Sequence, residues 1–356
     1  MDRKFQFQAT RRRFLTAGAG AFLPFLKSSA PAAEEALSAC LPPGRWAQVE
    51  ERVDGILAGI SIAQQPGGAL GAGNEAQPAA TSLAITAFLS RGHAPGRGPY
   101  GACLRNALEY VLSVQDAEGV FSGNGRSQDA TYHHAISGLM LGEVYGMAGQ
   151  GQSQRVRTAI ARALAVSRRS QLTSPGGTGM RYFTSPRDAD LSVTGAHFLF
   201  YRSARNAEFD VPESWIHKML TYVQSCAAEG GGFNYQPHSG PSLAMSSVGL
   251  LFMVMTGRQS HPLAVATARH ILTYDYSEGV PRRDYTLYYA SLAMSQMGGE
   301  HWRAFYPRLV DAQLSLPRQD SGLVGAAEPA YGAVLANAFY VLSLTPPCQV
   351  LPIFQR

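Results

Sequence analysis

The stretch YFTSPRDADLSVTGAHFLFYRSARNAEFDVPES, residues 182–214, contains the unit from which the whole chain is built. A loop that carries Asp188 and Asp190 leads into an uncharged run over 191–201, and an amphipathic segment begins at Glu213. A helix that is apolar on every side must be surrounded by protein, whereas an amphipathic helix covers a core with one face. The stretch therefore predicts a helical hairpin with one buried helix and one surface helix.

The same hairpin recurs six times along the chain. The amphipathic segments are 46–62, 100–114, 154–171, 213–227, 262–274 and 301–314, and the apolar segments are 81–89, 130–145, 191–201, 243–255, 285–297 and 330–342. Glycine-rich loops join each amphipathic segment to the next apolar one, and they recur at intervals of 43 to 60 residues. A two-helix period of this size is typical of helical repeat proteins.

Six apolar helices, each paired with an amphipathic helix, fit an inner ring wrapped by an outer ring. An open solenoid would need terminal repeats with a polar outer face, but the first and last units here are as apolar as the middle ones. We therefore predict an all-α fold, an (α/α)6 toroid over residues 46–356, preceded by a linker over 33–45. Ring closure brings Cys40 near Cys348, and in an oxidising compartment these two are candidates for a disulfide.

The first 32 residues are predicted to be a twin-arginine signal peptide. Residues 10–15 read TRRRFL, an apolar run continues to residue 26, and residues 30–32 form an A-x-A cleavage site. Because the apolar run is too short for a permanent anchor, we expect a periplasmic or extracellular protein that does not span the membrane. Residues 37–40 resemble a lipidation box at Cys40, but two glutamates separate them from the apolar run, so we favour the unlipidated form.

The net charge of +5 belongs to this leader. Six of the 30 basic residues and one of the 25 acidic residues lie within 1–32, which leaves 24 of each in the remaining chain. A neutral chain predicts no nucleic-acid partner. The histidines lack metal-ligand spacing and the four cysteines form no C-x-x-C pair, so we expect neither a metal nor another cofactor.

The loops QDAEGVF (115–121) and EGGGF (229–233), with the hairpin period, resemble the prenyltransferase and squalene oxidase repeat family. The chain looks like an exported, single-toroid bacterial member, which implies a terpenoid cyclase-like toroid. Squalene-type cyclases in that family protonate an alkene with an Asp-x-Asp-Asp motif at the start of an inner helix. The matching place here reads Asp188-Ala189-Asp190-Leu191, so the last carboxylate is missing. The zinc-binding Asp-x-Cys of protein prenyltransferases is absent from the sequence.

Three apolar segments carry a stripe of polar or aromatic residues at positions i, i+4, i+7 and i+11, which share one helix face. The stripes are Asp190–Thr194–His197–Tyr201, Tyr285–Tyr289–Leu292–Gln296 and Tyr132–Ile136–Leu139–Glu143. A buried polar stripe costs free energy unless it is paired or wetted, so we predict that the stripes face a central cavity. The predicted ligand-binding residues are Tyr132, His134, Thr194, His197, Tyr201, Tyr285, Tyr288 and Tyr289.

Each candidate residue also has a structural interpretation. Asp190 stands where a helix needs an N-cap, as do Thr81, Asp129, Ser242 and Asp284 in other units. A lone buried glutamate on a helix is typically paired with an arginine, a lone histidine is often a core residue, and aromatic residues at helical spacing usually form core. Asp188, by contrast, has no counterpart in the other units.

We expect an exported toroid that binds an apolar, isoprenoid-like small molecule, or a protein partner, in or over its central cavity. One alternative is a class II terpene cyclase-like enzyme with Asp190 as the general acid, Asp188 as its electrostatic neighbour and Glu143 as a further acid. The other alternative is a glycan-active (α/α)6 enzyme with paired carboxylates across a groove. The fold class leaves the choice between enzyme and binding protein open, and a filled centre would indicate a scaffold.

Overall fold

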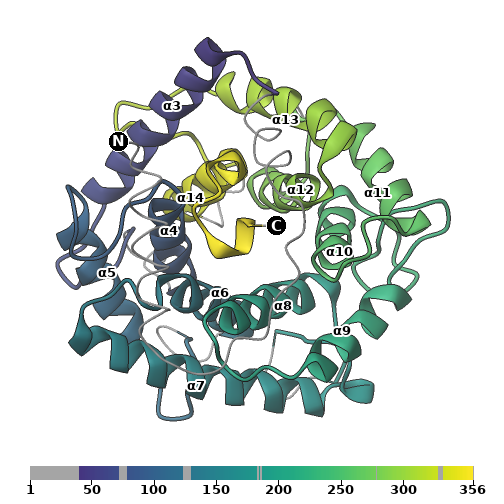
Figure 1. The fold of residues 1–356 in the computed structure, drawn as a ribbon, viewed down its shortest axis with the longest axis horizontal. Helices are drawn as coiled ribbons and strands as arrows, with labels where there is room; N and C mark the ends of the chain where they lie inside the picture. The colour runs from purple at the N-terminus through teal and green to yellow at the C-terminus, as the bar shows by residue number, and fades with distance from the viewer. Residues whose placement is uncertain are drawn as a thin grey trace, which may run out of the picture.

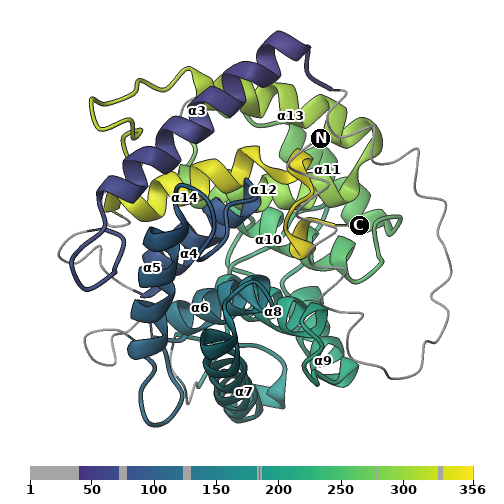
Figure 2. The same ribbon diagram turned by 60° about the vertical axis from the view of Figure 1, so that its left-hand side comes forward.

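In the part of the chain that the structure describes, twelve helices form two concentric rings (Figures 1 and 2). The computed structural model describes residues 40–71, 78–122, 130–182, 184, 187–277, 279–327 and 332–355. The predicted signal peptide lies outside these residues. Within them, no helix combines the length and the apolarity that crossing a bilayer requires.

The inner ring consists of the six apolar segments. They are α4 (Pro78–Ser90), α6 (Ala130–Val144), α8 (Leu191–Asn206), α10 (Leu243–Met255), α12 (Arg283–Met297) and α14 (Gly332–Leu344). Each packs against the next, and α14 packs against α4, so the ring is closed. All thirteen residues of α4 are buried, as expected for a helix without a polar face. The predicted (α/α)6 toroid is confirmed.

The outer ring consists of the amphipathic segments. They are α3 (Pro43–Ile62), α5 (Gly101–Ser113), α7 (Gln150–Thr173), α9 (Glu213–Ser225), α11 (Pro262–Leu272) and α13 (Gly299–Leu314). In α9 the buried residues are Ile216, Met219, Leu220 and Val223, which recur at the spacing of one helix face. The first helix begins at Pro43, three residues before the predicted start of the toroid, because proline suits the first turn of a helix.

The glycine-rich loops are anchored to the inner helices by one recurring hydrogen bond. In five units a loop N–H donates to a polar side chain at the same position of the inner helix. The bonds run from Leu70 to Thr81 (3.0 Å), Phe121 to His134 Nδ1 (3.3 Å), Met180 to Thr194 (2.9 Å), Phe233 to Ser246 (3.1 Å) and Val324 to Asn337 (2.9 Å). We call the ring end that carries these loops the loop rim.

The predicted helix caps are correct in two units. The Asp190 side chain accepts a backbone N–H from the first turn of α8, and Ser242 does the same for α10. Thr81 instead lies inside α4 and anchors its loop, and Asp284 lies inside the first turn of α12, where its carboxylate accepts a loop N–H (3.0 Å). The fifth predicted cap, Asp129, falls outside the described residues.

The chain ends in the middle of the ring (Figure 1). After α14, two short 3₁₀ turns, Pro346–Cys348 and Pro352–Phe354, run across the end of the toroid opposite the loop rim. Ile353 and Phe354 are buried against α8 and α12. We call residues 346–355 the tail and this end the tail rim.

Candidate functional site

A narrow apolar cavity lies at the centre of the inner ring. Its wall comes from five inner helices and consists of Leu83, Tyr132, Ile136, Leu139, Ala196, Leu199, Tyr288, Tyr289 and Phe339. The volume of this cavity is only about 10 Å³. That is room for roughly one water. The centre is therefore lined as a ligand site would be, but it is nearly filled.

Parts of two of the three predicted stripes belong to this wall. Tyr132, Ile136 and Leu139 of α6 line the cavity, as does Tyr289 of α12. Tyr288 joins them, and burial is the main reason that its pKa lies well above the ordinary tyrosine value.

Tyr285 stands behind the cavity wall. Its ring centroid lies 4.6 Å from that of Tyr289 and 5.9 Å from that of Phe339, both of which are wall residues. It supports the aromatic part of the wall from outside the cavity lining.

The third stripe faces the outer ring, which corrects the prediction for α8. Thr194 anchors the loop at Met180, and His197 Nδ1 lies 3.1 Å from the Ser167 hydroxyl of α7. The Tyr201 ring packs against Trp215 of α9 (5.6 Å between ring centroids). The face of α8 that lines the cavity carries Ala196 and Leu199 instead.

His134 is likewise a structural residue. Its Nδ1 accepts the Phe121 N–H and its Nε2 donates to the Ala163 carbonyl (3.0 Å), so the ring is neutral and fully engaged. Burial lowers the pKa of His134 to about 4 and that of His197 to about 3. Neither ring lines the cavity, and we leave both out of the proposed site.

Glu143 lies beneath the tail at the end of α6. Its carboxylate accepts hydrogen bonds from the Ser203 hydroxyl of α8 (2.6 Å) and from the Ile353 N–H of the tail (3.4 Å), and it is fully buried. A second bond runs from the Gln296 amide of α12 to the Phe354 carbonyl (3.1 Å). Glu143 and Gln296, the last residues of the α6 and α12 stripes, therefore hold the tail in place at the tail rim.

Asp188 and Asp190 share one arginine at the loop rim. Arg181 pairs with Asp188 through Nε (3.1 Å) and with Asp190 through Nη1 (2.9 Å). The Asp188 side chain is 53% exposed, whereas that of Asp190 is 0% exposed. Asp190 also accepts hydrogen bonds from Ser192 Oγ (2.6 Å) and the Val193 N–H (2.9 Å). Both its oxygens therefore have donors.

Burial raises the pKa of Asp190, and the hydrogen bonds from Ser192, Val193 and Arg181 act in the opposite direction. Asp190 does not line the central cavity. Its geometry is that of a cap held in an ion pair.

Two tyrosines complete a polar cluster around Arg181. The Tyr235 hydroxyl accepts a hydrogen bond from Arg181 (2.6 Å) and donates one to the Tyr182 hydroxyl (3.0 Å). The guanidinium also lies over both rings, 5.1 Å from the centroid of Tyr182 and 5.5 Å from that of Tyr235. We call Arg181, Tyr182, Asp188, Asp190 and Tyr235 the rim cluster.

The two ends of the described chain meet beside Tyr306. Cys40 and Cys348 are both thiols in the structure. Burial raises the pKa of Tyr306 well above its ordinary value, and the nearby thiols of Cys348 and Cys40 add to this. The disulfide between them remains a prediction.

Sequence reasoning missed several residues of these sites. The cavity residues Leu83, Ala196, Leu199 and Phe339 carried no polar signal, and Arg181 looked like an ordinary loop residue. Aligning the six units would have supplied one signal, because Thr81, His134, Thr194, Ser246 and Asn337 then fall at one position and are identified as loop anchors.

No protein-family profile matches the chain, and no curated protein sequence matches it either. Solved structures do match. The α-1,6-mannanase GH76A of Salegentibacter sp. HEL1_6 is similar with a TM-score of 0.61 at 10% identity, covering 85% of this chain and 99% of that chain. An inactive variant of that mannanase in complex with α-1,6-mannotriose is similar with a TM-score of 0.60 at 10% identity, over 84% and 99% of the two chains.

The second group of similar structures consists of type II terpene cyclases. A variant of MstE from Scytonema, in complex with its substrate geranylgeranyl dihydroxybenzoate, has a TM-score of 0.51 at 11% identity, covering 87% of this chain and 100% of that chain. The apo form of another MstE variant has a TM-score of 0.55 at 13% identity, over the same shares of the two chains. At such identities the likeness shows the (α/α)6 fold and leaves the activity open.

Proposed function

We propose that this protein is an exported, terpenoid cyclase-like toroid that binds an apolar small molecule in its central cavity without transforming it. One observation carries the proposal: aliphatic and aromatic side chains from five inner helices converge on one closed space at the ring centre. Concave sites lined largely by apolar side chains are typical of small-molecule binding. Export rests on the twin-arginine pattern of the leader.

The chemistry of the wall selects the ligand class. Tyr132, Tyr288 and Tyr289 present ring faces, and the remaining wall residues are aliphatic, alanine or phenylalanine. No charged side chain belongs to this wall, so a sugar or an anion would lose its hydrogen bonds to water and find only three tyrosine hydroxyls to replace them. An isoprenoid-like chain would lose none.

The narrow space requires the tail to move when a ligand binds. The tail covers the cavity from the tail rim, and its two bonds to the inner helices are the long contact at Glu143 (3.4 Å) and the contact at Gln296 (3.1 Å). Bonds of this kind contribute about 1 kcal/mol each. Burial of Leu351, Ile353 and Phe354 adds to these bonds. We infer that the tail is still the element that yields, because the inner ring closes without it, and that its closed state lowers the apparent affinity.

The position of Asp190 favours binding over cyclisation. A general acid must hold a proton and touch the substrate. Asp190 accepts from an arginine, a hydroxyl and a backbone N–H, and it lies outside the cavity wall. The chain thus keeps the cyclase-like scaffold and uses Asp190, the residue before α8, as a helix cap.

The rim cluster favours a second candidate function, which is glycan binding. Tyr182 and Tyr235 are half-buried and stand beside the exposed Asp188 carboxylate, which also accepts a hydrogen bond from Gln236 (3.2 Å). Aromatic faces next to hydrogen-bonding groups suit a sugar, and the mannanase that is similar in fold was solved with a mannotriose. This site is separate from the cavity, so variants can distinguish the two.

Mass spectrometry of small molecules extracted from the purified exported protein tests the proposal. We expect an apolar molecule to accompany the wild type and to be absent from Ala196→Phe, which fills the cavity. Ala161→Phe, on the exposed face of α7, is the matched control and should retain the molecule. Leu199→Phe offers a smaller change if Ala196→Phe fails to fold. Retention of the same molecule by a folded cavity variant would contradict the proposal.

A further inference from the structure

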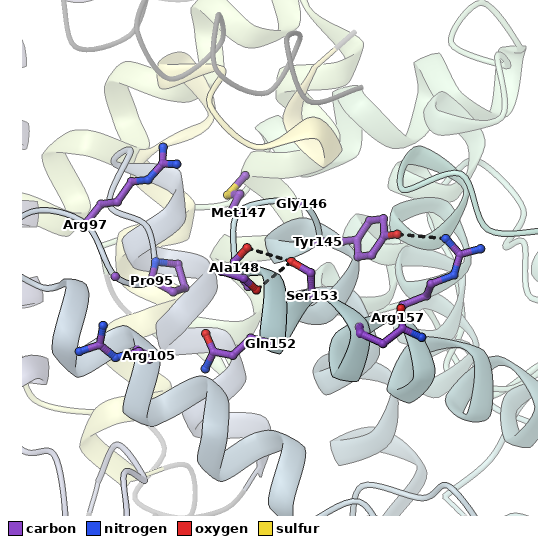
Figure 3. A pocket seen from close by; sticks show the side chains of 13 residues that line it. Pro95, Arg97, Arg105, Tyr145, Gly146, Met147, Ala148, Gln152, Ser153 and Arg157 are labelled. Atoms are coloured by element: carbon purple, nitrogen blue, oxygen red, sulfur yellow. Dashed lines mark hydrogen bonds between the residues drawn. The ribbon is translucent and has the colours of Figure 1, made fainter. Parts of the chain in front are cut away.

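A second, much larger cavity lies at the outer edge of the tail rim. It is an open groove of about 760 Å³ between two successive hairpins. One wall comes from the turn after α4 and from α5, and the other comes from the turn after α6 and from α7 (Figure 3). Its volume falls in the range of small-molecule sites, about 300 to 1,000 Å³. It is separate from the central cavity and from the rim cluster.

The groove is lined by positive charge without negative charge. Its thirteen lining residues include Arg97, Arg105 and Arg157 and no aspartate or glutamate. Within the described part of the chain, neither Arg97 nor Arg105 has an ion-pair or hydrogen-bond partner for its guanidinium group. Arg157 has one contact, to the Tyr145 hydroxyl (3.4 Å).

Among the described residues, some arginines elsewhere in the ring are neutralised by carboxylates, unlike the three in this groove. Arg91 pairs with Glu50 and Asp54, and Arg181 pairs with two aspartates. Glu109 of α5, which contacts the lining residue Gln152, is bound by Arg155 and by the Gln152 amide (2.7 Å). No acidic residue lies in the first turn of α7 either. The positive charge of the groove is thus left for a ligand.

The wall opposite Arg97 and Arg105 is held in place by its own contacts. The Tyr145 ring packs edge-on against Phe209 (5.4 Å between centroids), and its hydroxyl holds Arg157. The Ser153 hydroxyl donates to the Ala148 carbonyl (2.8 Å), which fixes the turn before α7. A ligand would therefore meet an ordered wall, and less conformational entropy would be lost on binding.

We propose that this groove binds a small polyanion with anionic groups at both ends. Figure 3 shows Arg97 and Arg105 on one side and Arg157 on the other, with Gln152 and Ser153 between them. The planar guanidinium fork matches carboxylate and phosphate oxygens in a bidentate way. Two arginines on one wall hold one end of the ligand, and Arg157 holds the other end. A ligand with an anionic group at each end can contact arginines of both walls, so the site favours di- or tricarboxylates or oligophosphates.

Isothermal titration calorimetry of the full mature chain tests this site with four probes: citrate, tripolyphosphate, acetate and inorganic phosphate. We expect one citrate or tripolyphosphate per chain, an affinity that falls with added salt, and at least tenfold weaker binding of acetate and inorganic phosphate. The stronger of the first two probes identifies the natural ligand as carboxylate or phosphate.

Variants locate the binding. Arg97→Gln with Arg105→Gln, and separately Arg157→Gln, should each weaken the preferred probe at least tenfold. Arg269→Gln, an exposed arginine of α11 on another part of the ring, is the matched control and should bind as the wild type does. Arg97→Lys with Arg105→Lys keeps the positive charge but loses the bidentate guanidinium group. Its affinity for the preferred probe should lie between those of the wild type and of the double glutamine variant. The proposal is overturned if neither polyanion binds, or if the folded groove variants bind as tightly as Arg269→Gln does.

Discussion

At the scale of single residues, Asp190 joins two tasks at the start of α8. One carboxylate oxygen caps the helix and the other pairs with Arg181. Asp190→Asn keeps a good cap and loses the charge, so we expect a cost of about 1 kcal/mol in the free energy of unfolding. Asp190→Ala loses both the cap and the charge, so the free energy of unfolding should fall by about 2 to 4 kcal/mol. Chemical denaturation measures the difference, with the simple cap variant Ser242→Ala as the reference. Equal costs for the two Asp190 variants would show that the cap contributes nothing.

The buried histidines make stability depend on pH. The folded pKa of His134 is about 4, below its unfolded value of about 6.5. Between these pH values the unfolded chain binds a proton that the folded chain excludes. The free energy of unfolding should therefore fall as the pH drops through this window, by roughly 3 kcal/mol at most for His134.

His134→Thr isolates this share of the pH dependence. Threonine stands at the same anchor position in two other units, at Thr81 and Thr194. The slope of unfolding free energy against pH, measured from pH 7 to pH 4, should become smaller in the variant, while the part due to His197 remains. An unchanged slope would mean that His134 is protonated in the folded protein.

Residue patterns indicated which side chains are polar and buried, but they could not fix the direction of each stripe. The α6 stripe faces the cavity, and the α8 stripe of identical spacing faces the outer ring. The α8 stripe contains the residue that anchors its loop, Thr194, which is bonded to Met180, whereas the α6 stripe leaves out its anchor, His134. The bond between Thr194 and Met180 depends on how the loop between them folds, and helical spacing in the sequence does not predict the fold of a loop.

At the scale of elements, small residues on the inner helices let the loops pack closely. The Phe233 ring of the loop before α10 lies where a Cβ on Gly249 would be, 2.3 Å from its nearest ring atom. Gly249→Ala should therefore cost about 1 to 3 kcal/mol by overpacking. Gly151→Ala on α7, where a Cβ meets nothing within 4 Å, should leave the stability within about 0.5 kcal/mol of the wild type. Thermal unfolding compares the two, and equal midpoints would contradict the packing argument.

The helices themselves were predictable at this scale, because charge content separates the two kinds. Uncharged runs became inner helices and amphipathic runs became outer helices, with ends that differ by a few residues. The tail was not predicted as an element. Its sequence, PPCQVLPIFQ, has no helical period, so its place in the fold is known only from its contacts with Glu143 and Gln296.

At the scale of the whole molecule, the ring closes through α4 and α14 without help from the tail. Deletion of residues 350–356 should therefore leave the helical circular dichroism largely unchanged and lower the free energy of unfolding, because Leu351, Ile353 and Phe354 lose their burial. Binding of the neutral dye Nile red should increase, since the cavity opens. Loss of helix content on deletion would show that the tail is part of the core instead of a cover.

The closed ring was predictable from the apolar terminal units, but the width of its centre was not. Width depends on how nine side chains from five helices interlock, and on a tail that folds back over them. The arginine groove was equally hidden, because Arg97, Arg105 and Arg157 come from separate elements of two hairpins. Which side chains come together in the cavity and in the groove depends on how the helices pack in the assembled toroid.

The most direct test of an apolar site in the ring centre is equilibrium titration of the mature protein with geranylgeraniol and, in parallel, with mannotriose. We expect one geranylgeraniol per chain, tighter binding after deletion of 350–356, at least tenfold weaker binding in Ala196→Phe, and wild-type binding in Ala161→Phe. Mannotriose should not compete. If geranylgeraniol fails to bind both the wild type and the tail deletion, or binds Ala196→Phe as well as it binds Ala161→Phe, the central cavity is not its site.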